Sequence, residues 1–147
     1  GPIADRIDLW MTMGPVDLPE LGKKVVHGSE TEVARKHVAD ARARQAERYA
    51  SFIKKKNSST LSDKAQGKPL GTSKTNSDLS PRELEELVPL TQSVRETLEK
   101  AASRLSLSPR AFHRVIKVAR TIADLDAAPD INESHVLEAL QYRQRKS

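Results

Sequence analysis

The chain of 147 residues contains no cysteine. This absence excludes disulfide bonds, thiolate catalysis and zinc sites with cysteine ligands, and folding needs no oxidising compartment. Aromatic residues make up only 3% of the chain. They are too few and too dispersed to indicate a base-stacking platform for single-stranded nucleic acid.

Long apolar segments are also absent from the sequence. No apolar run approaches the roughly 18 to 20 residues that a membrane-spanning helix needs, and the first residues lack the charged-then-apolar order of a signal peptide. We therefore expect a soluble, cytoplasmic protein without a membrane partner.

Recognisable nucleotide and metal motifs are missing as well. Residues 67–74 approach the phosphate-loop pattern, but the second glycine comes one position early and Ser73 separates Thr72 from Lys74. A solvated linker is the better interpretation of this stretch. The four histidines lack the spacing of metal ligands, so we expect no metal site.

Positive charge is what the chain does have in excess. Lysine and arginine number 25 against 20 acidic residues, which gives a net charge of +5. This balance favours an anionic partner, and nucleic acid is a better candidate than a membrane because no helix pairs a basic face with a strongly apolar one.

The clearest helix signal begins at Ser108, a natural N-cap that is followed by Pro109 at the first helical position. The helical spacing then places one apolar stripe on a single face. Its members are Phe112, Val115, Ile116, Ala119, Ile122 and Ala123.

The opposite face of this predicted helix carries Arg114, Lys117 and Arg120. Asp124 and Asp126 follow near the helix end, where we expect them to solvate a turn. Arg110 lies in the first turn, where a cation opposes the helix dipole, and this small cost suggests a role outside the helix.

A second long helix is predicted over residues 29–53, where the Ser29 to Glu32 capping-box pattern starts it. Its apolar stripe comprises Ala34, Val38, Ala41, Gln45, Tyr49 and Phe52. The helix becomes basic toward its end, and two interpretations remain open: a solvated face, or a nucleic-acid contact. The candidate contact residues are Arg44, Arg48, Lys54, Lys55 and Lys56.

Residues 54–78 are rich in lysine and serine and predict a flexible loop. Residues 79–147 predict a helical bundle: a short helix capped by Ser80, a helix over residues 92–104, the Ser108 helix, and a final helix capped by Asn132. The helix over residues 92–104 is expected to bury Val94, Leu98, Ala101, Ala102 and Leu105.

Residues 7–13 alternate between more and less apolar side chains, a pattern that predicts a strand ending at Gly14. A lone strand cannot satisfy its backbone groups. We therefore expect this segment to be disordered or paired with another copy.

Four stretches resemble the ComM/YifB family, the magnesium-chelatase-like AAA+ ATPases of bacteria. Residues 107–125 are similar to a family helix of pattern LSxRAxxRxxKVARTIADL, and residues 131–143 to the family's closing helix. Residues 1–9 resemble the GPxxDRID segment that ends the ATPase core, and residues 75–87 resemble a family helix start.

The resemblance implies that residues 1–28 end an ATPase core with its last strand, and that residues 79–147 form the helical lid. It also implies roles for two arginines. Arg6 resembles an arginine finger that reaches the nucleotide of the next subunit, where its fork of donors neutralises transition-state charge. Arg110 resembles the sensor 2 arginine of the lid, with Arg114 as the weaker alternative.

The family's activity implies an ATP-dependent, homo-oligomeric motor on DNA that promotes branch migration of incoming DNA. ATP and Mg²⁺ would be bound by the full-length protein and not by this chain alone, which lacks the phosphate loop. Two alternatives stay open: a helical module that binds nucleic acid or protein, and the lid of a magnesium-chelatase or regulatory ATPase that remodels proteins.

Overall fold

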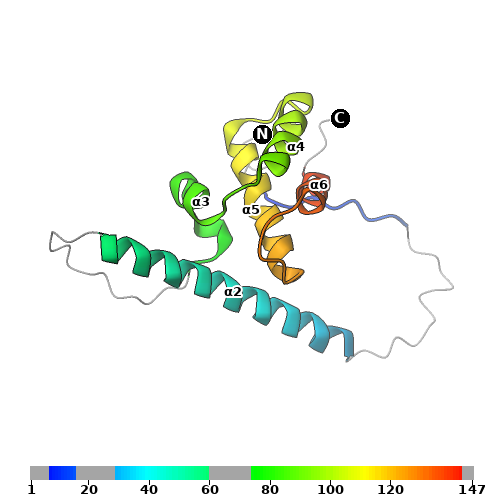
Figure 1. The fold of residues 1–147 in the computed structure, drawn as a ribbon. Coiled ribbons are helices and arrows are strands. Elements are labelled where there is room, and N and C mark those ends of the chain that lie inside the picture. Colours follow the sequence, from blue (N-terminus) through cyan, green and yellow to red (C-terminus); the bar gives the residue numbers. More distant parts are fainter. Residues whose placement is uncertain (1–6, 16–28, 60–73, 144–147) are drawn as a thin grey trace.

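The computed structural model describes residues 7–15, 29–59 and 74–143. In chain order the elements are α2 (Ser29–Ser59), the 3-10 turn η2 (Asn76–Asp78), α3 (Pro81–Leu87), α4 (Gln92–Arg104), α5 (Pro109–Leu125) and α6 (Glu133–Gln141). All regular structure within those three ranges is helical, which confirms the predicted class. Helix α5 lies at the centre and packs against α6, α2, α3 and η2 (Figure 1).

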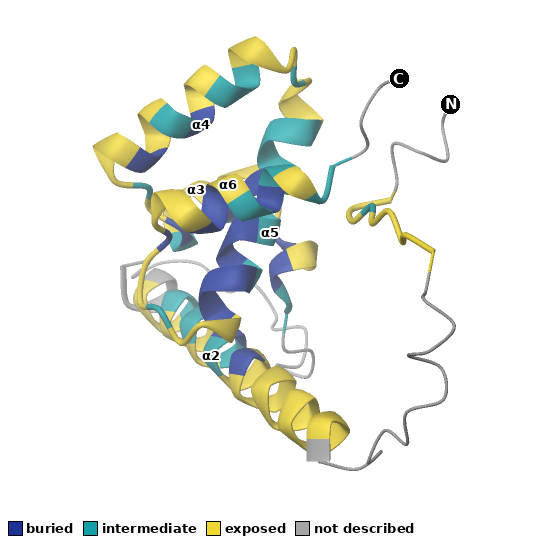
Figure 2. Ribbon diagram, turned by 90° about the vertical axis from the view of Figure 1, so that its right-hand side faces the viewer, coloured by how far each residue is buried: buried dark blue, intermediate teal, exposed yellow. Residues whose placement is uncertain are grey.

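The core forms around the apolar stripe of α5, as the periodicity predicted. Five stripe residues are buried, while Phe112 is half-buried at the edge of the cluster (Figure 2). Leu105 was expected inside but is 38% exposed, because it follows the last helical residue of α4. Burying one large apolar side chain contributes about 1.5 to 3 kcal/mol. The largest apolar side chains that are fully buried are Leu84, Leu98 and Val136, from α3, α4 and α6.

Side-chain caps fix the starts of α5, α3 and α6. The Ser108 hydroxyl accepts a hydrogen bond from the Ala111 amide at 3.2 Å. Ser80 and Glu83 form a reciprocal capping box, and Asn132 caps α6. These three helix starts were predicted from sequence, and the structure confirms them.

Helix α5 ends in a tight turn in which Ala127 has a positive φ of 55°. The Ala128 amide donates to the Ala123 carbonyl at 2.8 Å, and the Ala127 amide donates to the Asp124 carbonyl at 3.3 Å. This pair of bonds is a Schellman motif, which glycine usually closes. A left-handed alanine costs roughly 1 to 2 kcal/mol, and in return the chain reverses direction immediately after α5.

Helix α2 is longer than predicted, since it continues past residue 53 to Ser59. Its residues 30–40 are all exposed, including Val33 and Val38, whereas Ala41 and Gln45 are buried (Figure 2). The predicted apolar stripe therefore meets the bundle only from Ala41 onward. The side chain of Ser29, which the predicted capping box requires, lies outside the described side chains.

Residues 74–78, placed by sequence in the flexible loop, are ordered against the bundle. The Asp78 carboxylate accepts hydrogen bonds from the Thr75 amide and hydroxyl at 2.9 and 2.8 Å, and these bonds lower the pKa of Asp78. Asn76 is buried at 4% exposure. The rest of the predicted loop between residues 60 and 73 lies outside the described ranges.

Residues 7–15 have no regular secondary structure. The Trp10 amide donates to the Tyr142 carbonyl at 2.6 Å, which places this segment beside the end of α6. The predicted strand would need neighbours that these ranges do not supply, so it stays a prediction.

Candidate functional site

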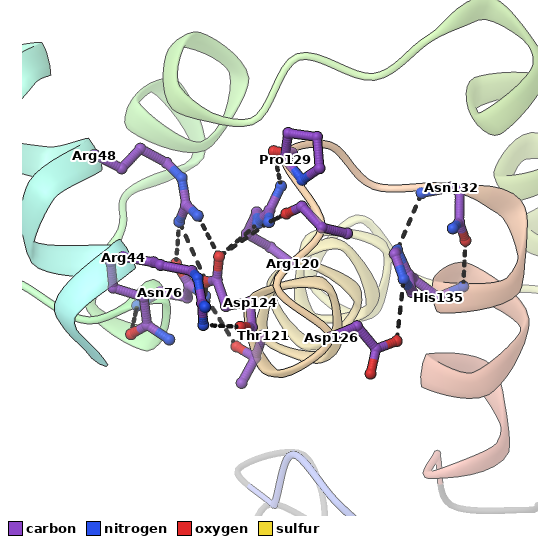
Figure 3. Close-up of polar contacts among 12 residues, drawn as sticks. Arg44, Arg48, Asn76, Arg120, Thr121, Asp124, Asp126, Pro129, Asn132 and His135 are labelled. Carbon is purple, nitrogen blue, oxygen red and sulfur yellow. Dashed lines mark hydrogen bonds and ion pairs between the residues drawn. The ribbon is translucent and has the colours of Figure 1, made fainter. Parts of the chain in front are cut away.

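A buried polar cluster joins α2, η2 and α5. It comprises Arg48, Asn76, Arg120 and Asp124, and is called the Asp124 cluster below (Figure 3). The Asp124 side chain is fully buried and pairs with both arginines. The side-chain amide of Asn76 (Nδ2) also donates to the Asp124 carboxylate at 2.9 Å. A buried carboxylate is tolerated only when it is paired and hydrogen-bonded, and here both conditions hold.

Arg120 donates hydrogen bonds to groups at the end of α5 and in the turn that follows it. Its guanidinium donates to the Asp124 carboxylate at 2.9 Å, to the Ala128 carbonyl at 2.8 Å and to the Pro129 carbonyl at 2.9 Å. Burial lowers the pKa of Arg120, and the Asp124 charge opposes that effect. The arginine thus satisfies carbonyls that the turn at Ala127 brings together.

Two sequence expectations are corrected here. Asp124 was expected to solvate a turn and Arg120 to lie on an open face, but both are buried, at 0% and 3% exposure. They lie one helical turn apart and pair with each other beside the apolar stripe. Asp126 does lie on the surface, where its carboxylate is 3.3 Å from Nε2 of His135.

The predicted nucleic-acid residues divide into two groups. Arg44 donates to the Asp124 carbonyl at 2.9 Å, and Arg48 pairs with the Asp124 carboxylate (Figure 3). Both arginines therefore hold α2 against the end of α5, and they are half-buried. Lys54 and Lys55 are exposed on the last turns of α2. The side chain of Lys56 lies outside the described residues.

The predicted sensor arginine, Arg110, is exposed in the first turn of α5. Among the described residues it has no side-chain partner, whereas the other cations of this helix do. Lys117 donates to the Ser77 carbonyl at 2.8 Å, and Arg120 belongs to the Asp124 cluster. Among the described parts of the chain, Arg110 is thus the one cation of α5 that is exposed and makes no side-chain contact.

Arg114, the alternative sensor, contacts the N-terminal segment. Its Nε atom lies 2.8 Å from the Asp8 carboxylate, and its Nη1 atom donates to the Ile7 carbonyl at 2.9 Å. Arg6, the predicted finger, falls outside the described residues. The structure places Ile7 and Asp8, the two residues that follow Arg6, beside the first turns of α5.

Sequence reasoning missed Asn76, Asp8 and His135. Asn76 and Asp8 are single polar residues. The side-chain partners of Asn76 lie 28 to 48 residues away along the chain, and Arg114 lies more than 100 residues from Asp8, so no local pattern marks them. His135 had a local signal, because it stands three residues after the cap Asn132. Its Nδ1 accepts from the Asn132 amide at 3.1 Å.

Two further observations limit the chemistry of the described residues. They contain no group of three histidine or acidic side chains that could hold a metal ion. None of the described helices combines the length and the apolar character that crossing a membrane requires.

Comparison with known proteins matches residues 28–143 to the family described as magnesium chelatase, subunit ChlI C-terminal. The chain is 32% identical over 143 residues to the competence protein ComM of Haemophilus influenzae and 33% identical over 144 residues to YifB of Escherichia coli. Each match covers 97% of this chain but only 24% of the relative.

The chain therefore spans about a quarter of the length of these relatives. The family match covers the whole helical bundle, including α2, the Asp124 cluster and the Arg110 turn. This match agrees with the resemblance of the sequence motifs. The chain therefore belongs to the magnesium chelatase ChlI C-terminal family and to its ComM/YifB group, as a helical lid of the AAA+ type.

Proposed function

We propose that this chain is the lid of an ATP-dependent DNA motor of the ComM type, in which Arg110 acts as the nucleotide sensor and Arg6 as an arginine finger. The full-length protein would bind ATP and Mg²⁺ and assemble as a homo-oligomer. The chain itself would supply residues to nucleotide sites without forming one, since its sequence holds no phosphate loop.

The observation that supports this proposal best is the contrast between Arg110 and the other cations of α5. Arg114, Lys117 and Arg120 contact groups within the chain, while Arg110 extends from the first turn into solvent. The positive end of the α5 dipole lies at the same place. An arginine beside a helix N-terminus suits a phosphate, because the charge and the dipole attract the same anion.

The experiment uses the full-length protein with Arg6→Ala and Arg110→Ala. Loss of a finger lowers the rate of hydrolysis by on the order of 10³ to 10⁵, because the arginine acts on transition-state charge. Nucleotide binding should persist in Arg6→Ala. Arg110→Ala should instead weaken the dependence of the lid position on nucleotide. Arg95→Ala, an exposed arginine of α4, is the matched control.

A mixing experiment tests action between subunits. Subunits with Arg6→Ala are combined with subunits that keep the finger but carry a disabled phosphate loop. Hydrolysis should return at interfaces where an intact finger meets an intact nucleotide site. No recovery in verified mixed assemblies would make Arg6 a structural arginine.

The alternative functions predict different responses to DNA. A DNA motor hydrolyses ATP faster when branched or single-stranded DNA is added, whereas a chelatase or protein-remodelling lid does not respond. An isolated binding module would retain DNA affinity in this chain alone. Arg44 and Arg48 bind Asp124, so two of the five candidate DNA-contact residues hold the fold together. This leaves fewer basic residues for DNA than the sequence suggested.

A further inference from the structure

The N-terminal segment is fastened to the lid by Arg114. The Asp8 carboxylate forms an ion pair with this guanidinium, and the Ile7 carbonyl accepts a hydrogen bond from it. The Trp10 amide, bonded to the Tyr142 carbonyl, forms the next anchor. Residues 7–10 therefore lie along α5 and the end of α6, although they have no regular secondary structure.

Cavities lie on both sides of this contact. One, of about 310 Å³, is lined by Trp10 and Ser108 among others, and a second, of about 390 Å³, by Met11 and Leu125. Asp8 and Arg114 line both of them. The apolar side chains of the segment are largely exposed, with Ile7 at 38%, Leu9 at 54% and Met11 at 73%. Little apolar packing therefore supports the segment, and the ion pair and the two hydrogen bonds hold it in position.

The contact between Arg114 and Asp8 lies close in the chain to both arginines proposed to contact nucleotide, Arg6 and Arg110. In the sequence, Arg6 directly precedes Ile7 and stands two positions before Asp8. Arg110 precedes Arg114 by one helical turn on the same side of α5, about 6 Å along the axis. Arg114 therefore holds the two residues that directly follow Arg6, and residues 6–8 are called the finger segment below.

We propose that Arg114 is a positioning residue, which through Asp8 makes the finger segment move together with the lid helix that carries Arg110. This inference rests on the proposed function. The contact is suited to reversible coupling, because Asp8 is 55% exposed and Arg114 is 21% exposed. An ion pair at such exposure is a weak contact, so it orients the segment without locking it.

The first test uses the 147-residue chain, whose single tryptophan is Trp10. Quenching of its fluorescence by acrylamide should rise about twofold in Arg114→Ala and Asp8→Ala, since the segment leaves the lid. Arg95→Ala should match the wild type. The double reversal Asp8→Arg with Arg114→Asp should restore the protection that is missing in each single reversal. Unchanged quenching in Arg114→Ala would overturn the proposal.

The second test measures ATP hydrolysis in the full-length protein. A misplaced finger should lower kcat by up to about fivefold in Arg114→Ala with little change in KM, because a weak contact shifts the population of the positioned state by no more than that. The double reversal should recover part of this loss. If Arg6→Ala slows hydrolysis while Arg114→Ala, with Trp10 released, does not, the coupling is wrong and the proposed function stands. If neither Arg6→Ala nor Arg110→Ala has an effect, the proposed function fails, and the quenching data still decide whether the contact exists.

Discussion

Arg48 on α2 forms an ion pair with Asp124 on α5, although 76 residues separate them in the chain. The carboxylate is fully buried, and Arg120 pairs with it from the same helix. Removing the acid would leave two guanidinium groups at a buried site without a counter-charge.

The first prediction is that Asp124→Ala lowers the free energy of unfolding by about 3 to 5 kcal/mol, the range for breaking a buried ion pair from one side. Urea unfolding of the 147-residue chain measures it. Glu85→Ala, which removes an exposed acid from α3, should change stability little. A decrease below about 1 kcal/mol in Asp124→Ala would show that the buried charge is not stabilising.

The turn after α5 predicts a stabilising substitution. Ala127 adopts a left-handed conformation that glycine adopts without strain. Ala127→Gly should therefore raise the free energy of unfolding by roughly 0.5 to 1 kcal/mol, and the thermal midpoint should rise. Ala128→Gly, at the next position, should lower both. A lower midpoint in Ala127→Gly would contradict the assigned helix ending.

Glu83 predicts a dependence of stability on acid pH. The hydrogen bond from Lys74 and the bond from the Ser80 amide lower the pKa of Glu83 from 4.5 to about 2. A carboxyl with a lowered folded pKa stabilises the fold above its unfolded pKa, and this contribution is lost as the pH falls through about 4.5 toward about 2. Glu83→Gln should remove this part of the pH dependence.

The check for Glu83 is a comparison of urea midpoints across that pH window for the wild type, Glu83→Gln and Glu85→Gln. The wild-type and Glu85→Gln proteins should lose stability in parallel. Glu83→Gln should start lower at neutral pH and converge with them in acid. Three parallel curves would mean that the Lys74 and Ser80 contacts do not favour the charged form.

The basic end of α2 predicts the DNA affinity of the isolated chain. If this chain binds DNA, changing Lys54, Lys55 and Lys56 to alanine should weaken binding and reduce the salt slope by about one for each lysine that neutralises a phosphate. Fluorescence anisotropy with a labelled duplex at several salt concentrations measures both quantities. Lys36→Ala, an exposed lysine on the other half of α2, is the matched control. Equal affinities would leave the lysines as a solvated face.

Local chemistry explains what the sequence predicted well. A serine cap followed by proline marks the start of α5 whatever surrounds it, and a stripe with helical spacing identifies its buried face. The same reasoning wrongly predicted that Arg120 and Asp124 are exposed, because charged residues at the border of an apolar stripe normally are. They are buried because Arg48 and Asn76, from distant parts of the chain, pack against them and bind Asp124.

The candidate site was less predictable than the fold. Arg110 and Arg114 stand one turn apart with the same charge, and the sequence alone ranked them only by resemblance. The difference between them depends on Asp8 and Ile7, which lie more than 100 residues earlier. Similarly, Arg44 and Arg48 share a basic helix with Lys54 and Lys55, and only the position of α5 separates structural cations from exposed ones.

Helix α2 is held near its middle, by Ala41, Gln45, Arg44 and Arg48, while its first turns extend beyond the bundle (Figure 1). Mechanically it is a lever with its pivot at the Asp124 cluster. The arm formed by residues 29–40 is roughly 18 Å long at 1.5 Å per residue, so a tilt of about 10° at the pivot displaces its tip by about 3 Å. A rearrangement of the Asp124 carboxylate and its two guanidinium partners that tilted α2 by this angle would move the tip of the arm by about the length of a hydrogen bond.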